Sequence, residues 1–479
     1  MERLESSINL LHLFAISSIF FYALAVICAI REIMYSRTSQ GSIAWLLSLF
    51  FLPMPTVFLY FIFAWKRLDD YIEVRDDISQ IETDVLNLHT PYVDGTASSR
   101  WPVHTRIASI PFLQHNQCRL LIDGPAMFTS IIEGIRTAEK HILVQFFIIR
   151  EDSIGLELAD VLIERAKAGL HVCLLYDDIG SRALSTQYLS RLEEAGVNVS
   201  GFNKRHRLMR ILGPMRLNYR NHRKVVVTDS KHCWIGGHNI GEEYLGLSKE
   251  FGHWRDTHVK VSGAAALAAT LSFSEDWQFA TGNTLQLELP ASFPKAGGEN
   301  VMVMPTGPAD VQEDCAISFV ESISRAKERL WIVSPYFVPG IEVLTALYAA
   351  ALRGVDVRIL LPEKADHWLV WLASYAHADN LASHGIKVYR YLEGFLHEKV
   401  ILVDSALAGV GTVNFDNRSF NINFEITLWF TGKNMVQQTE KMLLRDFEGA
   451  RRTDRAELNN RRYAFRVLAQ AARLFSPVL

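Results

Sequence analysis

The chain begins with two long apolar stretches. Residues 8–30 are almost continuously apolar, and a second apolar run covers residues 43–65 after a short polar link. Each run has about the length that a helix needs to cross a bilayer. The pattern therefore predicts a membrane anchor over residues 1–68, built as a hairpin of two transmembrane helices at about 8–30 and 43–65.

Two other interpretations of these stretches fit less well. A cleaved signal peptide has a shorter apolar core and a small-residue cleavage site, and no such site follows Ile30. Two buried core helices would rarely be this long and this apolar. Pro53 and Pro55 interrupt the second run. We expect that span to be kinked or re-entrant, since proline removes a backbone donor and needs local compensation in lipid.

The charges beside the apolar runs predict an orientation. Arg3 on one flank, with Lys66 and Arg67 on the other, slightly outnumber Arg31 and Arg37 in the link. The positive-inside rule then places both outer ends, and the globular part that follows, in the cytoplasm. The cysteines agree with a reducing compartment, because they are odd in number and form no C-x-x-C pair. They are Cys28, Cys118, Cys173, Cys233 and Cys315.

Beyond the anchor the pattern changes twice. Residues 69–106 are polar and rich in turn-forming residues, which predicts a linker. Short apolar runs then alternate with helical stretches, as in an α/β sheet that helices cover on both faces. The predicted strands lie at 141–149, 171–177 and 224–229, and a helix lies at 156–168.

The same order of elements recurs later in the chain. A strand at 329–337 is followed by a helix at 346–352 and a strand at 355–362. The segments 192–199 and 381–388 also correspond. An internal duplication is the simplest explanation. We therefore expect an α/β fold with two related domains, at 107–290 and 291–479, packed around one active site.

The charge balance shows no overall preference for polyanions. In 479 residues, 49 Lys and Arg stand against 52 Asp and Glu, so the net charge of −3 does not indicate nucleic acid. Two local stretches, residues 204–223 and the tail 451–479, are both basic and apolar. The first is equally well explained by contact with anionic headgroups and by a solvated loop. The tail is either an interfacial helix or a helix packed on the catalytic domain.

The candidate chemistry lies in a repeated motif, His-x-Lys-x4-Asp, followed by a turn and an asparagine. The first copy contains His222, Lys224, Asp229, Gly237 and Asn239. The second copy, with identical spacing, contains His397, Lys399, Asp404, Thr412 and Asn414. Residues two apart on a strand face the same side, so each histidine projects together with its lysine. The duplication would bring two imidazoles and two ammonium groups to one cleft.

This set of side chains suits phosphodiester cleavage through a covalent intermediate. Lys224 and Lys399 would neutralise the non-bridging oxygens, and the asparagines would add hydrogen-bond donors. One neutral imidazole attacks phosphorus, while the other, protonated, donates its proton to the leaving alkoxide. The scheme needs no metal or other cofactor, and no convincing carboxylate or thiolate cluster accompanies the histidines.

Each histidine needs an acceptor that orients its ring. Glu425 and Asp256 are the candidates, and the residues do not decide which acid serves which histidine. Asp229 and Asp404, although part of the catalytic motifs, lie far along the strand from the histidines. We expect them to hold the site together through hydrogen bonds. Of the remaining histidines, only His238 lies close enough to the motifs for a modest binding role.

Duplicated H-x-K-x4-D motifs followed by G-G/S/T-x-N resemble the signature of the phospholipase D superfamily, and the whole chain is similar in particular to bacterial cardiolipin synthases. Four further segments carry this similarity: RTSQGSIAW at 37–45, YRNHRK at 219–224, FGHWRDTHVKVSG at 251–263 and NFDNRSFNINFE at 414–425. Gly237 and Thr412 stand where relatives often have serine. The second half therefore keeps a hydroxyl that the first half lacks.

The resemblance implies a transphosphatidylation. One phosphatidylglycerol would give its phosphatidyl group to a histidine and release glycerol, and a hydroxyl of a second would attack to form cardiolipin. The resemblance also implies that His222 is the nucleophile and His397 the acid/base, a choice that the residues leave open. The expected location is the bacterial cytoplasmic membrane, with phosphatidylglycerol and anionic lipids as partners and no nucleic acid.

Rival functions differ in acceptor or substrate. A membrane-bound phospholipase D hydrolase, or another phosphatidyltransferase, would use the same residues with water or another headgroup. A nuclease would be expected to show a broad basic face. A catalytically inactive scaffold is disfavoured by the intact motifs.

Overall fold

The computed structural model describes the chain as two compact units, residues 1–68 with 205–219, and residues 69–204 with 220–479. The described residues are 2–35, 38–64, 68–77, 79–203, 218–295, 297–453 and 457–476. Most of the basic stretch predicted at 204–223 lies outside them.

Within the described residues, the N-terminal unit contains three helices, α1 (Glu2–Met34), α2 (Ser39–Phe51) and α3 (Pro53–Phe63). Among the described residues, only one helical segment, His12–Met34, is long and apolar enough to cross a membrane. Residues of α1 such as Ala25 and Cys28 pack with Leu49 of α2 and Val57 of α3. The first predicted apolar helix is therefore present and extends beyond its predicted bounds.

The second apolar run is divided at Leu52. Pro53 begins α3 because a proline has no N–H and is tolerated in a first helical turn. The resulting helices have 13 and 11 residues. Each is shorter than the roughly 20 residues that span a bilayer. The predicted interruption at the prolines is thus present, whereas a second continuous transmembrane helix is not.

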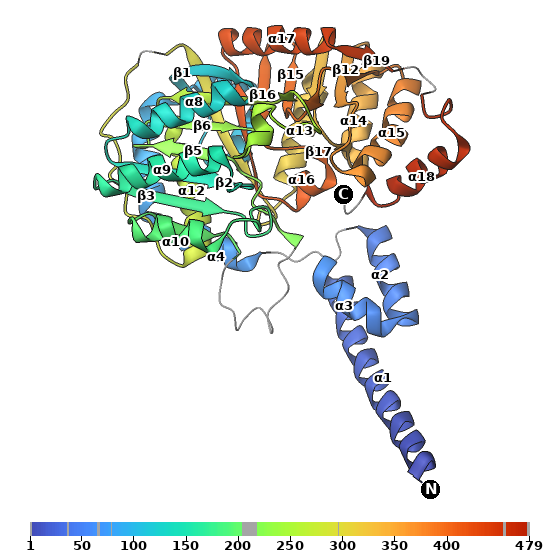
Figure 1. Ribbon diagram of the computed structural model, residues 1–479. Helices are drawn as coiled ribbons and strands as arrows, with labels where there is room; N and C mark the ends of the chain where they lie inside the picture. Colours follow the sequence, from blue (N-terminus) through green and yellow to red (C-terminus); the bar gives the residue numbers. More distant parts are fainter. Residues whose placement is uncertain are drawn as a thin grey trace. The chain divides into compact units, whose positions relative to one another are not determined.

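The second unit is an α/β structure built on one long series of strands (Figure 1). In the part of the chain that the structure describes, 15 strands pair in the order β19-β13-β12-β10-β15-β16-β18-β9-β1-β8-β6-β5-β2-β3-β4. The central pair, β1 and β9, is antiparallel. On either side of it the strands follow one order, β8-β6-β5-β2-β3-β4 and β18-β16-β15-β10-β12-β13. The predicted duplication is therefore confirmed as two related α/β halves.

The bounds of the elements follow the repeat. The first half contains β1 (Leu113–Ile122), α8 (Asp123–Arg136), β2 (His141–Phe146), α9 (Ser153–Lys167), β3 (His171–Tyr176), α10 (Thr186–Glu194), β4 (Asn198–Gly201), β5 (Val225–Thr228), β6 (His232–Gly236), η3 (Glu242–Leu245), β7 (Trp254–Arg255), β8 (Thr257–Ser262) and α12 (Ala266–Thr281). All three strands predicted in this half, and the helix between the first two, are present.

The second half repeats the pattern with additions at its C-terminal end. It contains β9 (Glu299–Thr306), α13 (Asp314–Arg325), β10 (Arg329–Val333), β11 (Phe337–Val338), α14 (Ile341–Leu352), β12 (Asp356–Pro362), α15 (Trp368–Ser383), β13 (Lys387–Tyr391), β14 (Phe395–Leu396), β15 (Val400–Val403), β16 (Leu407–Gly411), β17 (Phe415–Asp416), α16 (Asn417–Asn421), β18 (Glu425–Phe430), α17 (Lys433–Glu448), β19 (Ala450–Arg452) and α18 (Tyr463–Arg473).

Both faces of the strands are buried, as the apolar runs predict. All residues of β2 and β5 are buried. Ile142 and Val144 of β2 join a core formed with α8 and α9. Gln145, which points to the other face, donates a hydrogen bond to Asp276 of α12. The alternation along β2 therefore assigns different helices to its two faces.

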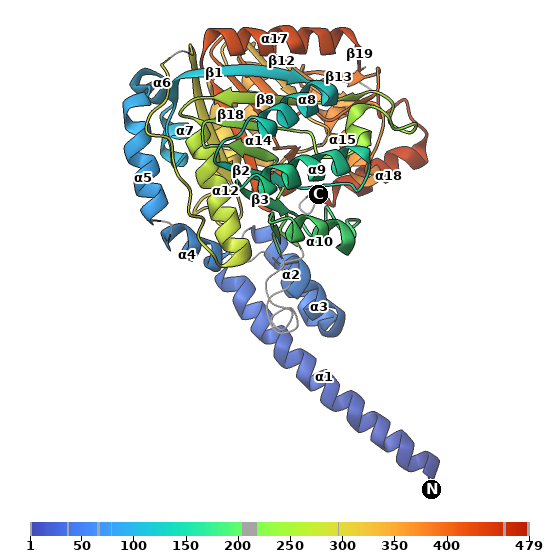
Figure 2. The same cartoon turned by 60° about the vertical axis from the view of Figure 1, so that its left-hand side comes forward.

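The segment predicted to be a linker is instead folded. Residues 69–107 form α4 (Asp69–Asp77), α5 (Ser79–His89), η1 (Thr90–Tyr92), α6 (Gly95–Arg100) and α7 (Pro102–Ile107). Both α4 and α5 contact α12, beside which they lie in Figure 2. Tyr71, Val85 and Trp101 are buried. The linker prediction was wrong because few, widely spaced apolar residues are enough to pack helices whose other faces remain polar.

Candidate functional site

Each motif histidine is fixed at the backbone by the opposite half. The amide of His222 donates to the carbonyl of Phe424 over 2.9 Å, and the amide of His397 donates to that of Arg255 over 2.8 Å. Phe424 and Arg255 immediately precede the two predicted orienting acids. These bonds bring each histidine to the other half's acid.

The two acids pair with the histidines across the halves. Nδ1 of His222 lies 2.9 Å from Oε2 of Glu425, and Nδ1 of His397 lies 2.7 Å from Oδ2 of Asp256. The pairing that the sequence left open is therefore Glu425 with His222 and Asp256 with His397. A carboxylate at Nδ1 favours the tautomer with hydrogen on that nitrogen, which leaves Nε2 for a substrate.

The motif lysines are buried beside their histidines. Nζ of Lys224 donates to the carbonyl of His222 over 2.7 Å and lies 5.4 Å from the ring centre of Phe147. Nζ of Lys399 bonds to the carbonyl of His397 and lies 2.9 Å from its Nδ1. Each lysine ammonium therefore lies beside the histidine that precedes it by two residues.

Burial and the neighbouring cations shift the titration of this cluster. Burial lowers the pKa of His222 to about 4, against the opposing effect of Glu425. Burial also lowers the pKa of His397 well below its usual value, assisted by Lys399, Lys224 and His222. The ligand-free site therefore holds neutral imidazoles at pH 7, and groups of both halves act on one another.

The pKa values of the two motif lysines are also lowered. Burial lowers the pKa of Lys399 to about 8, and it lowers that of Lys224 well below its usual value. For Glu425, burial alone would raise the pKa, but His222 and Lys224 hold it below its usual value. A bound phosphodiester anion would favour the charged forms of both lysines and both histidines.

The halves differ in how they support the acids. Oγ1 of Thr412 donates to Oε2 of Glu425 over 2.5 Å and accepts the amide of Ile426. At the corresponding Gly237, a Cβ atom would lie only 2.0 Å from Oδ1 of Asp256. The first half therefore has a carboxylate where the second half has a threonine side chain, which accounts for the missing hydroxyl.

The motif asparagines have different surroundings. Asn239 accepts the amide of Ile148 over 3.1 Å and donates to the hydroxyl of Tyr244 over 3.1 Å. Asn414 is buried, and its side-chain oxygen has no hydrogen-bond partner. Asn239 is thus engaged in fixing the loop after β2, while Asn414 keeps an oxygen without a donor.

The motif aspartates lie at the other ends of strands β5 and β15. Asp229 accepts the amides of Glu139, Lys140 and His141 at the start of β2 over 2.7–3.1 Å. Asp404 accepts the amides of Lys327, Glu328 and Arg329 at the start of β10. These contacts favour the interpretation that both aspartates hold the strands in place rather than contact a substrate.

The arrangement can be compared with known proteins. The family model described as cardiolipin synthase, phospholipase D-like domain, matches residues 131–277 and again 319–447, and the phospholipase D-nuclease N-terminal model matches residues 23–65. Cardiolipin synthase A of Pseudomonas syringae pv. syringae (strain B728a) is 41% identical over 469 residues, which cover 96% of this chain and 97% of that protein. The chain belongs to the cardiolipin synthase family.

Further comparisons agree with this assignment. Cardiolipin synthase A of Pseudomonas aeruginosa (strain LESB58) is 41% identical over 465 residues, covering 95% of this chain and 94% of that protein. Among solved structures, phosphatidylserine synthase of Haemophilus influenzae Rd KW20 matches with a TM-score of 0.61 at 16% identity, covering 80% of this chain and 100% of that chain. At that identity the match concerns the phospholipase D-like fold alone.

In this member of the cardiolipin synthase family, a carboxylate that sequence analysis missed holds the residues on both sides of His222. Asp276 of α12 accepts from Nδ2 of Asn221 over 2.9 Å and from Nη1 of Arg223 over 2.9 Å. It also accepts the hydroxyl of Tyr71 of α4 over 2.8 Å. The only sequence signal for Asp276 is its position beside Glu275 in an otherwise uncharged helix.

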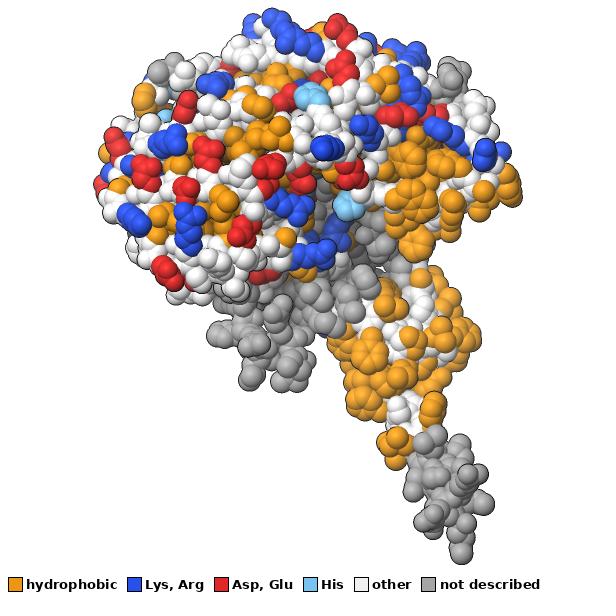
Figure 3. Space-filling view, in the orientation of Figure 1, with side chains coloured by type: hydrophobic (Ala, Val, Ile, Leu, Met, Phe, Trp, Pro, Cys, Tyr) orange, Lys and Arg blue, Asp and Glu red, His pale blue; other side chains and the backbone are white. Residues whose placement is uncertain are grey.

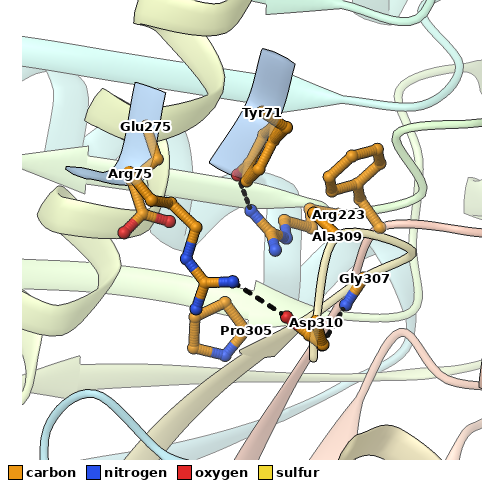
Figure 4. Close-up of a pocket in the computed structure, with 9 residues that line it drawn as sticks. Tyr71, Arg75, Arg223, Glu275, Pro305, Gly307, Ala309 and Asp310 are labelled. Carbon is orange, nitrogen blue, oxygen red and sulfur yellow. Dashed lines mark hydrogen bonds and ion pairs between the residues drawn. The ribbon is translucent and has the colours of Figure 1, made fainter. Parts of the chain in front are cut away.

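Arg223 links this cluster to the opposite half. Its Nε donates to the carbonyl of Glu425 over 3.0 Å, and its Nη2 donates to that of Thr306 over 3.2 Å. Nearby, Arg75 of α4 pairs with Asp310 over 3.0 Å, and these residues line the small pocket in Figure 4. The residue between His222 and Lys224 therefore ties the first motif to the acid that orients it.

The middle residue of the second motif has a matching role. Glu398 is fully buried and pairs with Arg255 at 2.8 Å. Arg255 also pairs with Asp446 of α17 at 2.7 Å and immediately precedes Asp256. Both motifs thus use the residue between His and Lys to contact the segment that carries the other half's acid.

His238 is placed near the site but within the core. It is fully buried, and its Nδ1 lies 3.3 Å from Nδ1 of His258. Burial lowers the pKa of His238 to about 4. Within the described residues, no group of three or more His, Cys, Asp and Glu side chains could hold a metal ion.

Proposed function

We propose that this protein is a cardiolipin synthase, which transfers a phosphatidyl group from one phosphatidylglycerol to another and releases glycerol. The main support is the crossed arrangement of two His/Lys sets, in which each half's histidine is paired with the other half's carboxylate. Such an arrangement suits one active site between the halves. Relatives named cardiolipin synthase A match nearly the full length of the chain.

In the first step, Nε2 of neutral His222 attacks phosphorus of the donor lipid. The P–O bond to glycerol breaks as the P–N bond forms, and protonated His397 gives its proton to the departing glycerol oxygen. Glu425 stabilises the positive charge that develops on the ring of His222. Lys224 and Lys399 offset negative charge on the non-bridging oxygens.

In the second step, His397 acts as a base, and a hydroxyl oxygen of the second lipid takes the place of the glycerol oxygen. Neutral His397 removes the proton from a hydroxyl of the second phosphatidylglycerol, and that oxygen attacks phosphorus. The P–N bond breaks, cardiolipin forms, and His222 returns to its neutral state. Water in place of the second lipid would give phosphatidic acid, so transfer requires that the acceptor exclude water from the cleft.

His397 must gain a proton before the first step. Its pKa in the ligand-free site is well below the usual value because it is buried near two lysines. A bound phosphodiester monoanion counteracts those lysines and raises the pKa of His397. Substrate binding therefore prepares the acid that the reaction needs.

We further propose that the N-terminal unit anchors the enzyme in the bacterial cytoplasmic membrane, with α2 and α3 re-entering the same bilayer as α1 and the catalytic unit on the cytoplasmic side. The apolar segment His12–Met34 supports the anchor. Cysteine accessibility to a membrane-impermeant reagent, measured on intact and opened cells, would test the orientation.

The proposed activity is tested with purified protein in vesicles of phosphatidylglycerol, using mass spectrometry of the products. Cardiolipin and glycerol in equal amounts are the expected result. Phosphatidic acid without cardiolipin would indicate a hydrolase. Nicked DNA without a lipid product would indicate a nuclease, and either outcome would contradict the proposal.

A further inference from the structure

The C-terminal helix α18 is packed on one side and uncovered on another. Phe465 lies against α15, with ring centres 5.9 Å from Trp371 and 5.4 Å from Tyr375. Ala469 and Ala472 on the same side are buried. The predicted tail therefore packs on the catalytic unit, but these three residues use only a narrow stripe of its surface.

The next stripe, formed by α18 and the two residues after it, is apolar and exposed. Val467, Leu468, Leu474 and Phe475 expose 46–78% of their surface, and at the start of α15 Trp368 exposes 58%. Figure 3 shows apolar side chains gathered over α15 and α18 on the right of the catalytic unit. Contiguous exposed apolar surface of this kind marks an interaction site in a soluble domain.

The charges on α18 and its flanking residues have one sign. Arg462, Arg466 and Arg473 are exposed on α18, and no Asp or Glu occurs between residues 458 and 476. A second copy of the chain would bring arginines against arginines. An anionic bilayer instead offers acyl chains to the apolar stripe and phosphates to the arginines.

The same surface is linked to the segment that follows the second motif. Asn417, which follows the second motif, donates to the carbonyl of Ser476 after α18 over 2.8 Å and to that of Val338 over 3.2 Å. His367, next to Trp368, is among the groups that lower the pKa of His397. One end of the exposed surface is thus hydrogen-bonded to the segment after the second motif, and the other end carries a histidine that acts electrostatically on His397.

We propose that the exposed face of α18 and the first turn of α15 lies in the headgroup region of an anionic bilayer, and that phospholipid reaches the active site across it. The bilayer contact stands on exposure and charge alone. The route of the lipid rests on the proposed function. This face would be a second membrane contact, additional to the N-terminal unit.

The contact is tested with the full-length protein carrying one fluorescent label. In a Cys118→Ser background, whose other described cysteines are buried, a polarity-sensitive dye is attached to Leu474→Cys or Val467→Cys. Leu352→Cys and Val311→Cys are matched controls, since these residues are 87% and 82% exposed outside the proposed face. Each variant is reconstituted in phosphatidylglycerol vesicles with brominated lipid.

Bromine should quench the dye at positions 474 and 467 at least about threefold more than at 352 and 311, and exchange of phosphatidylglycerol for a zwitterionic lipid should reduce this difference. Equal quenching at all four positions would overturn the proposal. So would a blue shift at 474 that depends on protein concentration in detergent, since it would identify a second copy as the occupant. Neither reading requires catalytic activity.

The route of the lipid is tested with Leu474→Glu combined with Phe475→Glu. Transfer on vesicle phosphatidylglycerol should fall about tenfold, while transfer on short-chain phosphatidylglycerol, dispersed as monomers, should stay within about twofold of the parent. Unchanged activity on vesicles would overturn the route, as would an equal loss on both substrates. If the parent protein formed no cardiolipin, the proposed function would be rejected. The labelling experiment would still decide whether the face contacts the bilayer.

Discussion

At the scale of single residues, the candidate site combines buried charges with hydrogen bonds from the opposite half. Glu425 carries its charge in the core because His222, Thr412 and Asn423 all surround its two oxygens. A buried carboxylate without such partners would be protonated or would destabilise the fold. The same contacts fix the ring of His222 in one orientation.

The two histidines should be individually indispensable. We expect His222→Ala and His397→Ala each to reduce turnover by at least about 10³-fold, because each removes a covalent or proton-transfer step. Insertion in the membrane should be unchanged, since the substitutions affect chemistry rather than the anchor. Mass spectrometric assay of membranes with equal amounts of each variant provides the measurement. Robust activity in either variant would contradict the roles assigned here.

Lys399 should limit activity at alkaline pH. The pKa of Lys399 is lowered to about 8. The ammonium therefore loses its proton as the pH rises through that value, and the site loses that positive charge. The rate constant kcat/KM, which reports on the free enzyme, should therefore fall above about pH 8. In Lys399→Arg the side chain stays charged. The alkaline fall should move upward even if the maximal rate is lower, and an unmoved profile would assign it to another group.

At the scale of elements, α4 and α12 support the loop that precedes β5. The hydroxyl of Tyr71 and the guanidinium of Arg223 converge on Asp276, and all three side chains are buried. Because α4 follows the anchor directly in the chain, its packing joins the first residues after the anchor to the motif of His222. The polar residues that led to the linker prediction form the outer surface of these helices.

Removal of the charge on Asp276 should destabilise this junction. Asp276→Asn leaves Arg223 buried without its ionic partner, and loss of one member of a buried pair costs about 3 kcal/mol or more. We expect a clear fall in the unfolding midpoint of the detergent-solubilised protein, together with reduced turnover. Asp160→Asn is the matched control, because it removes a largely exposed pair with Arg191. Equal midpoints for the two variants would show that the cluster contributes little.

At the scale of the whole molecule, the duplication produces two histidine–carboxylate pairs, and neither half holds both members of a pair. The halves meet through β1 and β9, and short strands cross between them, β7 with β14 in particular. The histidine of each half thereby comes to the carboxylate of the other. The proposed single active site depends on this exchange.

Loss of the second-half acid should therefore impair the first-half histidine. Glu425→Gln keeps the shape but removes the charge that stabilises the imidazolium of His222, so formation of the phosphohistidine should slow by about 10²-fold or more. Rapid acid quenching with labelled lipid measures this step. Glu321→Gln, in a partly exposed pair with Arg325, is the control and should leave the rate unchanged. Full activity of Glu425→Gln would show that His222 does not depend on the acid of the second half.

Chelation of divalent cations should leave the rate essentially unchanged. The proposed scheme assigns every proton transfer and every neutralised oxygen to side chains of the two motifs. Turnover on phosphatidylglycerol vesicles would be measured before and after treatment with a chelator. A strong loss that one divalent ion reverses would contradict the scheme.

Much of the molecule followed from local sequence pattern. Apolar runs located the strands and the first membrane helix, because burial on both faces leaves a continuous hydrophobic signal. The spacing of His, Lys and Asp located both motifs, because residues two apart on a strand share a face. Polar helices with few buried residues, such as those of 69–107, carried too weak a signal.

Local pattern was enough to locate the strands, the duplicated motifs and the reactive side chains. Which acid orients which histidine became clear from the folded chain alone, since Glu425 is 203 residues from His222 and Asp256 is 141 residues from His397. Periodicity states which side of its own strand a residue occupies, not which distant strand it meets. The same limit hid Asp276, whose role arises where α4, α12 and the first motif come together.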